Sequence, residues 1–250
     1  MPALDEATRT QLLQAFEMKR NRDLTKILKK IVKTPDTELM GSLTELFAEM
    51  LAQDPTFYMN STYLDLQNVL KKQDPRDLFT MDRTLIERFS LFPNEQIIAE
   101  CYGAVEENFG KIKPARVFIT PYRIIASGFK VIQTKGLGYA LPIYAAISIA
   151  MDMSRKIRDA IARQFGSQER IMYGFIYPVQ NSTKLKRSAS VLRYRNVMEY
   201  TDDKGRLKTL KLDFKLQPKP MKGQDKNEFK SNTQKVFDVI TNIIGSGGNT

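Results

Sequence analysis

The sequence predicts an α+β protein in which helices come first and strands follow. Apolar residues recur at helical spacing through most of residues 1–90, whereas short apolar and alternating runs dominate from residue 91 onward. The change falls at Phe92-Pro93. We therefore expect a helical bundle over residues 1–90, a β domain over 91–245 and a flexible tail over 246–250.

The N-terminal part contains a series of amphipathic segments. Residues 4–33 read as two helices with a break near 21–23, and Pro35 ends the second, because proline disfavours helix in the residue before it. Further apolar stripes run over 39–51, 63–70 and 78–89, separated by Asp-Pro pairs. Helices with such short breaks usually pack as an antiparallel bundle.

The second part reads as strands with two helices among them. Strands are expected at 96–105, 117–119, 124–126, 171–179, 190–200 and 206–216. The last two form the clearest hairpin, since Leu210, Leu212 and Phe214 alternate with Lys211 and Asp213, which predicts one buried and one wet face. Helices are expected at about 139–165, as an insertion, and at 225–244, docked on the sheet.

Charge is concentrated in the second part. Residues 1–88 hold 13 Lys and Arg against 14 Asp and Glu, whereas residues 111–222 hold 23 against 7, a net charge of +16. A field this one-sided attracts anions such as phospholipid head groups, nucleic acid or an acidic protein. The plainer alternative is a solvated surface that only keeps the protein in solution.

Several function classes are disfavoured. The chain has no histidine and only one cysteine, Cys101, which excludes histidine-based catalysis, an intramolecular disulfide and a cysteine-ligated metal site. No phosphate-binding glycine loop is present. The apolar stretch 137–151 is shorter than the ~20 residues that span a bilayer. We expect a cytoplasmic protein, at most peripheral to a membrane, with no catalytic site, metal or cofactor.

Residues 92–105 and 115–128 resemble the opening of GRAM and related pleckstrin-homology (PH)-like domains. The hairpin pattern of that superfamily is filled here by Phe118, Ile119, Thr120, Arg123, Ile124 and Ile125. The resemblance implies a small β-barrel over about 92–244, capped by the C-terminal helix. It also implies binding of phosphoinositides, anionic membranes or proteins without catalysis. The helix at 139–165 and the N-terminal bundle depart from the family plan.

The resemblance also places a first group of candidate residues. In PH-like barrels, the loop after the first strand and the mouths of the next strands often hold head groups. The matching positions in this chain are Lys111, Lys113, Arg116 and Arg123. Several Lys and Arg side chains that converge on phosphate form charge-assisted hydrogen bonds. The alternative for Arg123 is a structural ion pair with Glu95 or Glu100.

A second basic cluster follows further along the chain, and we interpret its first part as a flexible loop. It comprises Lys184, Lys186, Arg187, Arg193 and Arg195. Beside a membrane, each such charge gains on the order of 1 kcal/mol from anionic lipid. The same cluster would also suit nucleic-acid phosphates, or would simply be solvated.

Three hypotheses therefore stand. The first is an adaptor whose basic PH/GRAM-like domain binds anionic membrane lipid or an acidic protein, while the helical bundle binds a protein partner. The second is a nucleic-acid-binding protein that uses the same basic surface. The third is a structural scaffold without an anionic ligand.

Overall fold

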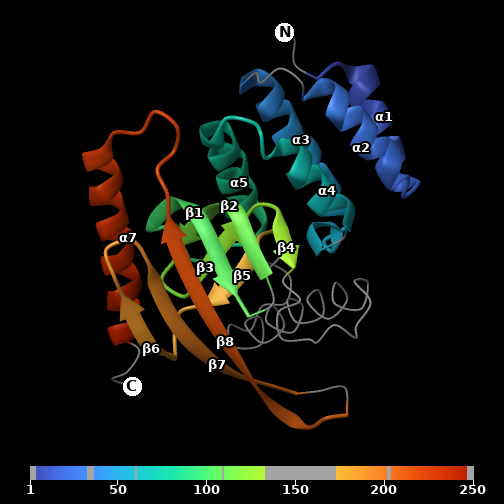
Figure 1. Ribbon diagram of the computed structural model, residues 1–250. Helices are drawn as coiled ribbons and strands as arrows, with labels where there is room; N and C mark the ends of the chain where they lie inside the picture. Colours follow the sequence, from blue (N-terminus) through green and yellow to red (C-terminus); the bar gives the residue numbers. More distant parts are fainter. Residues whose placement is uncertain are drawn as a thin grey trace. The chain divides into compact units, whose positions relative to one another are not determined.

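The computed structural model describes residues 4–32, 37–59, 61–108, 110–132, 173–201 and 204–246, and every structural statement below concerns these residues. The chain divides into two compact units, Met1–Ser90 and Leu91–Thr250. The predicted α+β class is confirmed, with helices first and strands after (Figure 1). The predicted helix at 139–165, the apolar stretch 137–151 and residues 247–250 lie outside the described residues.

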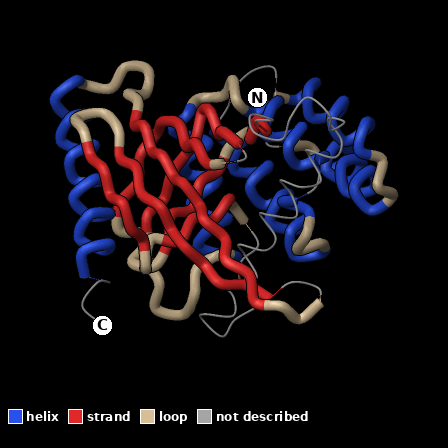
Figure 2. Tube along the Cα trace, turned by 60° about the horizontal axis from the view of Figure 1, so that its bottom comes forward, coloured by secondary structure: helices blue, strands red, loops and turns tan. Residues whose placement is uncertain are grey.

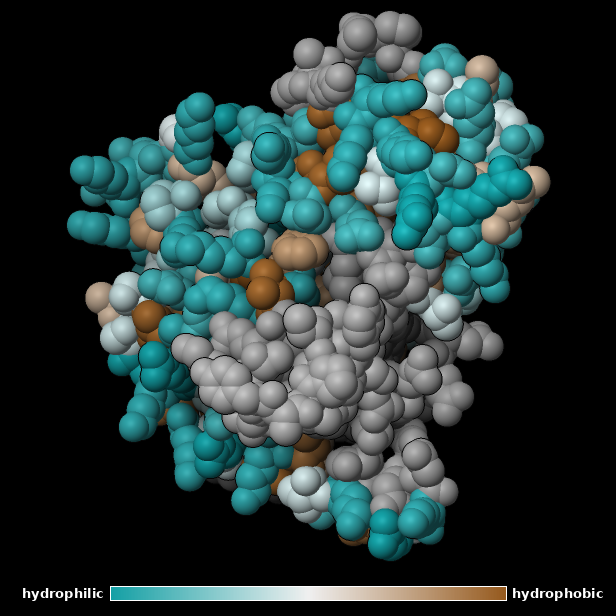
Figure 3. All heavy atoms as spheres, turned by 45° about the vertical axis from the view of Figure 1, so that its right-hand side comes forward, coloured by the Kyte–Doolittle hydropathy of each residue, from teal (hydrophilic) through white to brown (hydrophobic). Residues whose placement is uncertain are grey.

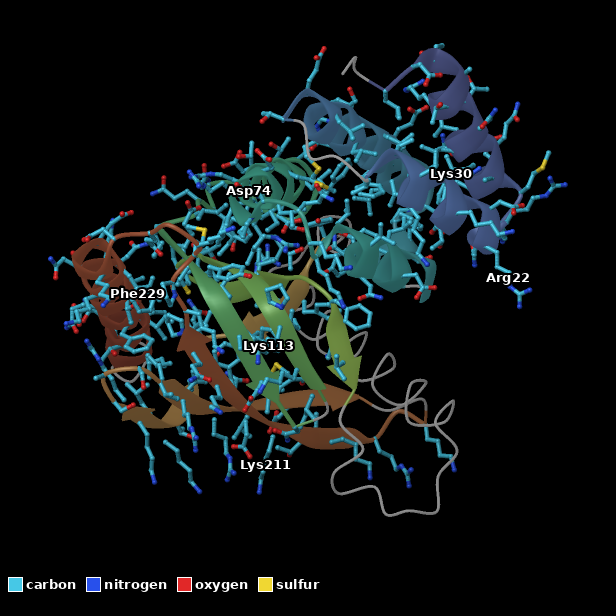
Figure 4. The ribbon with its side chains drawn as sticks, turned by 45° about the horizontal axis from the view of Figure 1, so that its top comes forward. Arg22, Lys30, Asp74, Lys113, Lys211 and Phe229 are labelled. Atoms are coloured by element: carbon cyan, nitrogen blue, oxygen red, sulfur yellow. The ribbon has the colours of Figure 1, made fainter. Side chains whose placement is uncertain are left out.

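Unit 1 is helical throughout. Its elements are α1 (Glu6–Glu17), α2 (Asn21–Ile31), α3 (Thr37–Gln53), the 3-10 helix η1 (Phe57–Met59), α4 (Ser61–Leu70) and α5 (Pro75–Phe89). Helices α1 and α5 each begin after an aspartate whose side chain accepts a hydrogen bond from the first turn. The Asp74 carboxylate accepts a hydrogen bond from the Arg76 backbone N–H at 2.8 Å, and Pro75 occupies the first helical position (Figure 4).

The core of unit 1 lies between the apolar stripes of these helices. Leu43, Leu46 and Met50 of α3 are buried, as the periodicity predicts. Phe57 of η1 meets Phe16 of α1 edge-on, with 4.9 Å between the ring centroids. Phe57 also meets the Tyr63 ring of α4 edge-on, with 5.5 Å between the ring centroids, so the short 3-10 turn joins the first and fourth helices through aromatic contacts.

Unit 2 is an antiparallel sheet with one C-terminal helix. Its elements are β1 (Ala99–Glu107), β2 (Gly110–Ile119), β3 (Arg123–Ser127), β4 (Lys130–Ile132), β5 (Phe175–Pro178), β6 (Ser182–Arg187), β7 (Leu192–Thr201), β8 (Leu207–Pro218) and α7 (Lys226–Ser246). The strand order is β5-β3-β2-β1-β8-β7-β6, with β4 paired to β2. Figure 2 shows the strands of the sheet in red and the helices in blue.

The sheet is open, which differs from the closed barrel that we expected. The terminal strands β5 and β6 do not pair with each other. The sheet nevertheless curls, as shown by the distance of 4.9 Å between the ring centroids of Tyr177 in β5 and Phe214 in β8. Helix α7 packs against β1 and β6 and buries Val236, Phe237 and Ile240, while Phe229 is half-buried (Figure 4). Helix α7 thus covers part of the open sheet.

The junction between β1 and β8 depends on a glycine. Gly103 lies opposite Pro218, where the β1 register against β2 also shifts. A Cβ atom at Gly103 would clash with the Gln217 carbonyl oxygen and the Pro218 Cα. Only glycine permits this close approach, which brings the far end of β1 beside β8.

Strand β6 corrects the prediction of a flexible basic loop. Residues Ser182–Arg187 pair with β7 over Leu192–Asn196. The sequence offers only one apolar residue there, Leu185, so neither alternation nor β-propensity indicated a strand. Strand β6 is held by backbone pairing with β7, which the side-chain pattern of β6 does not predict. The three-residue strand β4 was likewise not predicted.

The predicted hairpin is confirmed as β7–β8, and it extends beyond its neighbours. Leu192–Thr201 pair with Leu207–Leu216. However, β6 pairs with β7 only as far as Asn196, and β1 pairs with β8 only over Lys215–Pro218. The distal half of the hairpin therefore has no other strand beside it in the described part of the chain (Figures 1 and 2).

Candidate anion-binding face

The outer face of β6, β7 and β8 carries a group of basic side chains, and we call it the basic face. Along β8, Leu210, Leu212, Phe214 and Leu216 are buried, whereas Lys211 and its alternating neighbours point outward (Figure 4). Cross-strand partners share a face of a sheet, so the register determines which residues of β7 and β6 join them.

One row of directly opposed residues crosses five strands. Its members are Lys111 of β2, Glu106 of β1, Lys215 of β8, Arg193 of β7 and Lys186 of β6. Glu106 accepts hydrogen bonds from both neighbouring lysines, at 2.7 Å in the case of Lys215. Beyond Lys215 the row continues with two more cations in succession. Like charges directly opposite one another destabilise a sheet, so this part of the row conflicts with local stability.

A β-bulge in β6 creates this arrangement. Thr183 lies opposite Arg195 and Lys186 opposite Arg193, so two residues of β6, Lys184 and Leu185, face the single residue between them on β7. Without the extra residue, Lys186 would point to the opposite face. Lys184 itself has a φ of 54°, a left-handed conformation that glycine adopts far more readily. The bulge therefore gathers two lysines on the basic face at a conformational cost.

A second row lies one step along the strands. Arg195 of β7 donates two hydrogen bonds to the Asp213 carboxylate of β8, at 2.5 and 2.8 Å. The Asn108 side chain, just beyond β1, donates to the Lys211 carbonyl and accepts from the Asp213 backbone N–H, at 2.9 and 2.8 Å. This row is charge-balanced, so the uncompensated cations of the basic face are those of the first row, Lys184 in the bulge, and Lys211, which lies opposite Val197.

A cavity of about 660 Å³ opens between the two rows. It is lined by Glu106, Glu107, Asn108, Lys184, Lys186, Arg193, Tyr194, Arg195, Asp213, Phe214 and Lys215. Each of its three carboxylates already contacts a lysine or arginine, including Glu107, which pairs with Lys130. In contrast, Lys184, Lys186 and Arg193 form no ion pair with any described residue. The cavity thus presents three cations to whatever enters it.

The carboxylates of the basic face are held in their charged form. Partial burial by itself would raise the pKa of Glu106, but the hydrogen bonds and charges of Lys111 and Lys215 outweigh it and lower the pKa. The hydrogen bond from Arg195 lowers the pKa of Asp213, against a smaller desolvation effect and with help from the charges of Arg195 and Lys184. Glu106 and Asp213 therefore keep their negative charges around neutral pH. The chain has no histidine.

The first predicted group of site residues does not assemble as a surface site. Arg116 is 1% exposed and donates to the Ser127 hydroxyl at 3.4 Å. Arg123 is 0% exposed and pairs with Glu95, which agrees with the structural alternative for this residue. Both arginines lie in the core, where an external ligand has no access. Lys111 is bound to Glu106, and Lys113 is exposed on β2 (Figure 4).

Most residues of the second predicted group lie together around one cavity. Lys184, Lys186, Arg193 and Arg195 all line the cavity. Arg187 does not, because its guanidinium pairs with Asp238 of α7 at 2.7 Å. Lys215 and Lys211 also lie on the basic face, although the sequence indicates them only as residues on the solvated side of a hairpin. Their alternation was visible, but their position beside β7 required the register.

Two exposed apolar residues share the basic face. Val197 lies opposite Lys211 and is 39% exposed, and Leu207, opposite Thr201, is 67% exposed. Both belong to the distal half of the hairpin. The face therefore combines cations near its base with apolar side chains towards its tip.

Comparison of the chain with models of known protein families, with curated proteins and with solved structures found no match. Within the described ranges, no helix has both the length and the apolar character needed to cross a bilayer. The described residues also contain no cluster of three or more potential metal ligands of the His, Cys, Asp or Glu type.

Proposed function

We propose that this chain is a non-enzymatic adaptor that binds the anionic surface of a membrane through the basic face of unit 2. One observation carries the proposal: Lys215, Arg193 and Lys186 lie directly opposite one another across three strands. The bulge in β6 adds Lys184 to the same face. Repulsion among these cations costs stability, and phosphate groups at a membrane surface would relieve it. In this proposal the helical unit 1 binds the protein partner of the adaptor.

A membrane is favoured over nucleic acid by the other residues of the basic face. Single-stranded nucleic acids bind sheets through exposed aromatic rings on which bases stack. The described outward residues of β6, β7 and β8 include no aromatic ring, and Tyr194 and Phe214 are buried, stacked on each other at 4.8 Å. Exposed Val197 and Leu207 suit the boundary between head groups and acyl chains instead.

We also propose that unit 2 is a PH/GRAM-like domain whose sheet has remained open. Support comes from the antiparallel succession of β1, β2 and β3, which contains the matched hairpin, and from the C-terminal helix packed against the sheet. Such domains bind phosphoinositides or anionic membranes. The open sheet and the long β7–β8 hairpin distinguish this chain from the closed plan.

Co-sedimentation tests the proposed function. The full chain is mixed with phosphatidylcholine vesicles with or without phosphatidylglycerol, and separately with single-stranded RNA. Pelleting only with anionic vesicles supports the proposal. Salt-dependent RNA retention without vesicle binding would select the nucleic-acid alternative, and failure to bind either would leave the scaffold hypothesis.

The single substitution Arg193→Glu should change vesicle affinity and thermal stability in opposite directions. It places a carboxylate between Lys186 and Lys215, so the thermal midpoint of unit 2 should rise, in line with about 0.2–1 kcal/mol for a favourable cross-strand pair. Affinity for anionic vesicles should fall about tenfold, because one attractive charge becomes repulsive. Lys230→Glu on α7, at an exposed position, is the matched control. Unchanged affinity in Arg193→Glu would argue against the basic face.

Removing one carboxylate should have the opposite effect on binding. Asp213→Asn releases Arg195 from its ion pair and adds one positive charge to the face. Vesicle affinity should rise up to about fivefold, which corresponds to about 1 kcal/mol per charge. The free energy of unfolding should fall by less than about 1 kcal/mol, because the pair is at the surface. Vesicle titration and thermal unfolding measure the two quantities, and weaker binding would contradict the assignment.

Binding should be nearly independent of pH between about 5 and 8. The pKa values of Glu106 and Asp213 are lowered, so the stability that their ion pairs contribute is fully present above the ordinary carboxyl pKa and is lost only as pH falls through the lowered values. With no histidine, the face keeps its charge above the ordinary carboxyl pKa. Affinity for phosphatidylglycerol vesicles should change less than about twofold. A steep change near pH 6.5 would indicate a different binding group.

A further inference from the structure

Unit 1 carries a second cationic surface that its nearly neutral composition conceals. Residues 19–30 contain six basic residues and a single acidic one, Asp23. All six basic side chains are exposed, at the turn before α2 and along one side of that helix (Figure 4 labels two of them). They are Lys19, Arg20, Arg22, Lys26, Lys29 and Lys30.

These cations differ from others in the same unit. Arg9 pairs with Glu49 of α3, Arg83 with Glu87, and Arg88 with Glu45, so each of these arginines has a carboxylate partner. None of the six basic residues of the α2 region forms an ion pair with a described residue. The positive charge is therefore segregated on one helix.

The segregation conflicts with helix stability. Arg22, Lys26 and Lys30 are spaced four residues apart and lie above one another on the helix, where like charges repel. The apolar side of α2 does not explain them, because Leu24 and Leu28 are buried in the bundle whatever the outer side carries. The helix dipole favours Lys29 and Lys30 in the last turn of α2 but not Arg22 in the first. The like charges of Arg22, Lys26 and Lys30 still repel one another, and this repulsion points to an external anion.

The turn before α2 adds an apolar side chain to this surface. Met18 is 60% exposed, the most exposed large apolar residue described in unit 1. Most of the described surface in Figure 3 is hydrophilic, so such residues are exceptions. Lys19 beside it has a φ of 53° at the end of α1, a position that usually holds glycine. Leu207, between Arg206 and Lys208 in unit 2, repeats the pattern of an exposed apolar residue among cations.

We infer that this α2 face, Met18 to Lys30, is a second membrane contact, which binds an anionic lipid bilayer with Met18 entering the interfacial layer. Flexible cations reach lipid phosphates, and the thioether side chain gains from leaving water. Nucleic acid would satisfy the charges but would give an exposed methionine no apolar environment. The inference does not depend on the basic face of unit 2, since it rests on different residues.

The first test neutralises the α2 face in the full chain. Arg22, Lys26, Lys29 and Lys30 are replaced by glutamine, which preserves helix propensity. The control replaces Lys222, Lys226, Lys230 and Lys235 by glutamine, four exposed lysines at or near α7. Binding to phosphatidylcholine vesicles containing phosphatidylserine should weaken on the order of a hundredfold in the α2 variant and far less in the control. Equal losses in both would overturn the inference.

The second test reads the position of residue 18 directly. The chain contains no tryptophan, so Met18→Trp introduces a single fluorophore. Its emission should shift to shorter wavelength with anionic vesicles but not with neutral ones. Thr80→Trp, at an exposed position of α5, should show no shift. An unshifted spectrum for Met18→Trp, an equal shift at residue 80, or a shift induced by RNA instead of vesicles would refute the membrane contact.

The two proposed membrane contacts can be tested independently of each other. In a chain whose basic face is charge-reversed at Lys184, Lys186 and Arg193, residual vesicle binding should disappear when the α2 face is neutralised. If the α2 variant binds like the wild type while Arg193→Glu weakens binding, only the α2 inference falls. If Arg193→Glu has no effect and the α2 variant loses binding, only the proposed function of unit 2 falls.

Discussion

Simultaneous replacement of Lys184, Lys186 and Arg193 by glutamate is expected to weaken binding to phosphatidylglycerol vesicles at least about a hundredfold. Each cation near an anionic surface contributes on the order of 1 kcal/mol, so loss of all three removes about 3 kcal/mol, and the new carboxylates add repulsion. These residues form no ion pair with described carboxylates, so their substitution leaves no buried partner behind. Vesicle co-sedimentation over a lipid titration measures the change.

The control for this variant replaces Lys226, Lys230 and Lys235 of α7 by glutamate. It makes the same change in net charge within the same unit and also at exposed positions. Its binding should weaken much less, because the effect depends on where the cations gather. Comparable losses in the two variants would mean that only the total charge of the chain matters, and the basic face would have no special role.

Glu95→Gln is expected to destabilise unit 2 by about 3–5 kcal/mol, because it leaves an arginine charged and buried without its partner. Arg123 donates to Glu95 through Nε at 3.0 Å and a terminal nitrogen at 2.7 Å, and both side chains are 0% exposed. The carboxylate also accepts from the Phe92 backbone N–H at 2.8 Å, and the guanidinium lies 4.2 Å from the centre of the Phe92 ring. Urea unfolding monitored by circular dichroism measures the loss.

The matched comparison for this prediction is Asp213→Asn. The Arg195–Asp213 pair has the same two-bonded geometry but lies at the surface, so its loss should cost less than about 1 kcal/mol. The double variant Glu95→Leu with Arg123→Met should be less destabilised than the sum of the single changes, because it removes both charges at once. A Glu95→Gln loss no larger than that of Asp213→Asn would show that burial does not govern this pair.

Residues with clear local signals were predicted well. Asp74-Pro75 marked the start of a helix because proline lacks an N–H and aspartate accepts from the first turn. The alternation from Leu210 to Leu216 placed β8 with its correct face inward, since a buried face imposes a period of two. Arg123 was weighed as a partner of Glu95, and the two residues pair.

The misassignments share a physical origin. Strand β6 carries mostly polar residues on an edge, so its pairing comes from backbone hydrogen bonds that side-chain patterns do not report. The family resemblance places Arg116 among the anion-binding residues at the mouth of a barrel, yet it is buried beside Ser127. The closed barrel was expected from the order of elements, and whether a sheet closes depends on strand curvature and on what covers its ends.

By itself the sequence determined the class of the fold, the boundaries of most helices, the inward face of the long hairpin and the concentration of positive charge. These properties depend on residues close together in the chain. Only the tertiary structure decided which cations meet. The one-residue bulge at Lys184 and the close approach at Gly103 bring residues far apart in sequence into one row, and such register arises from pairing between strands.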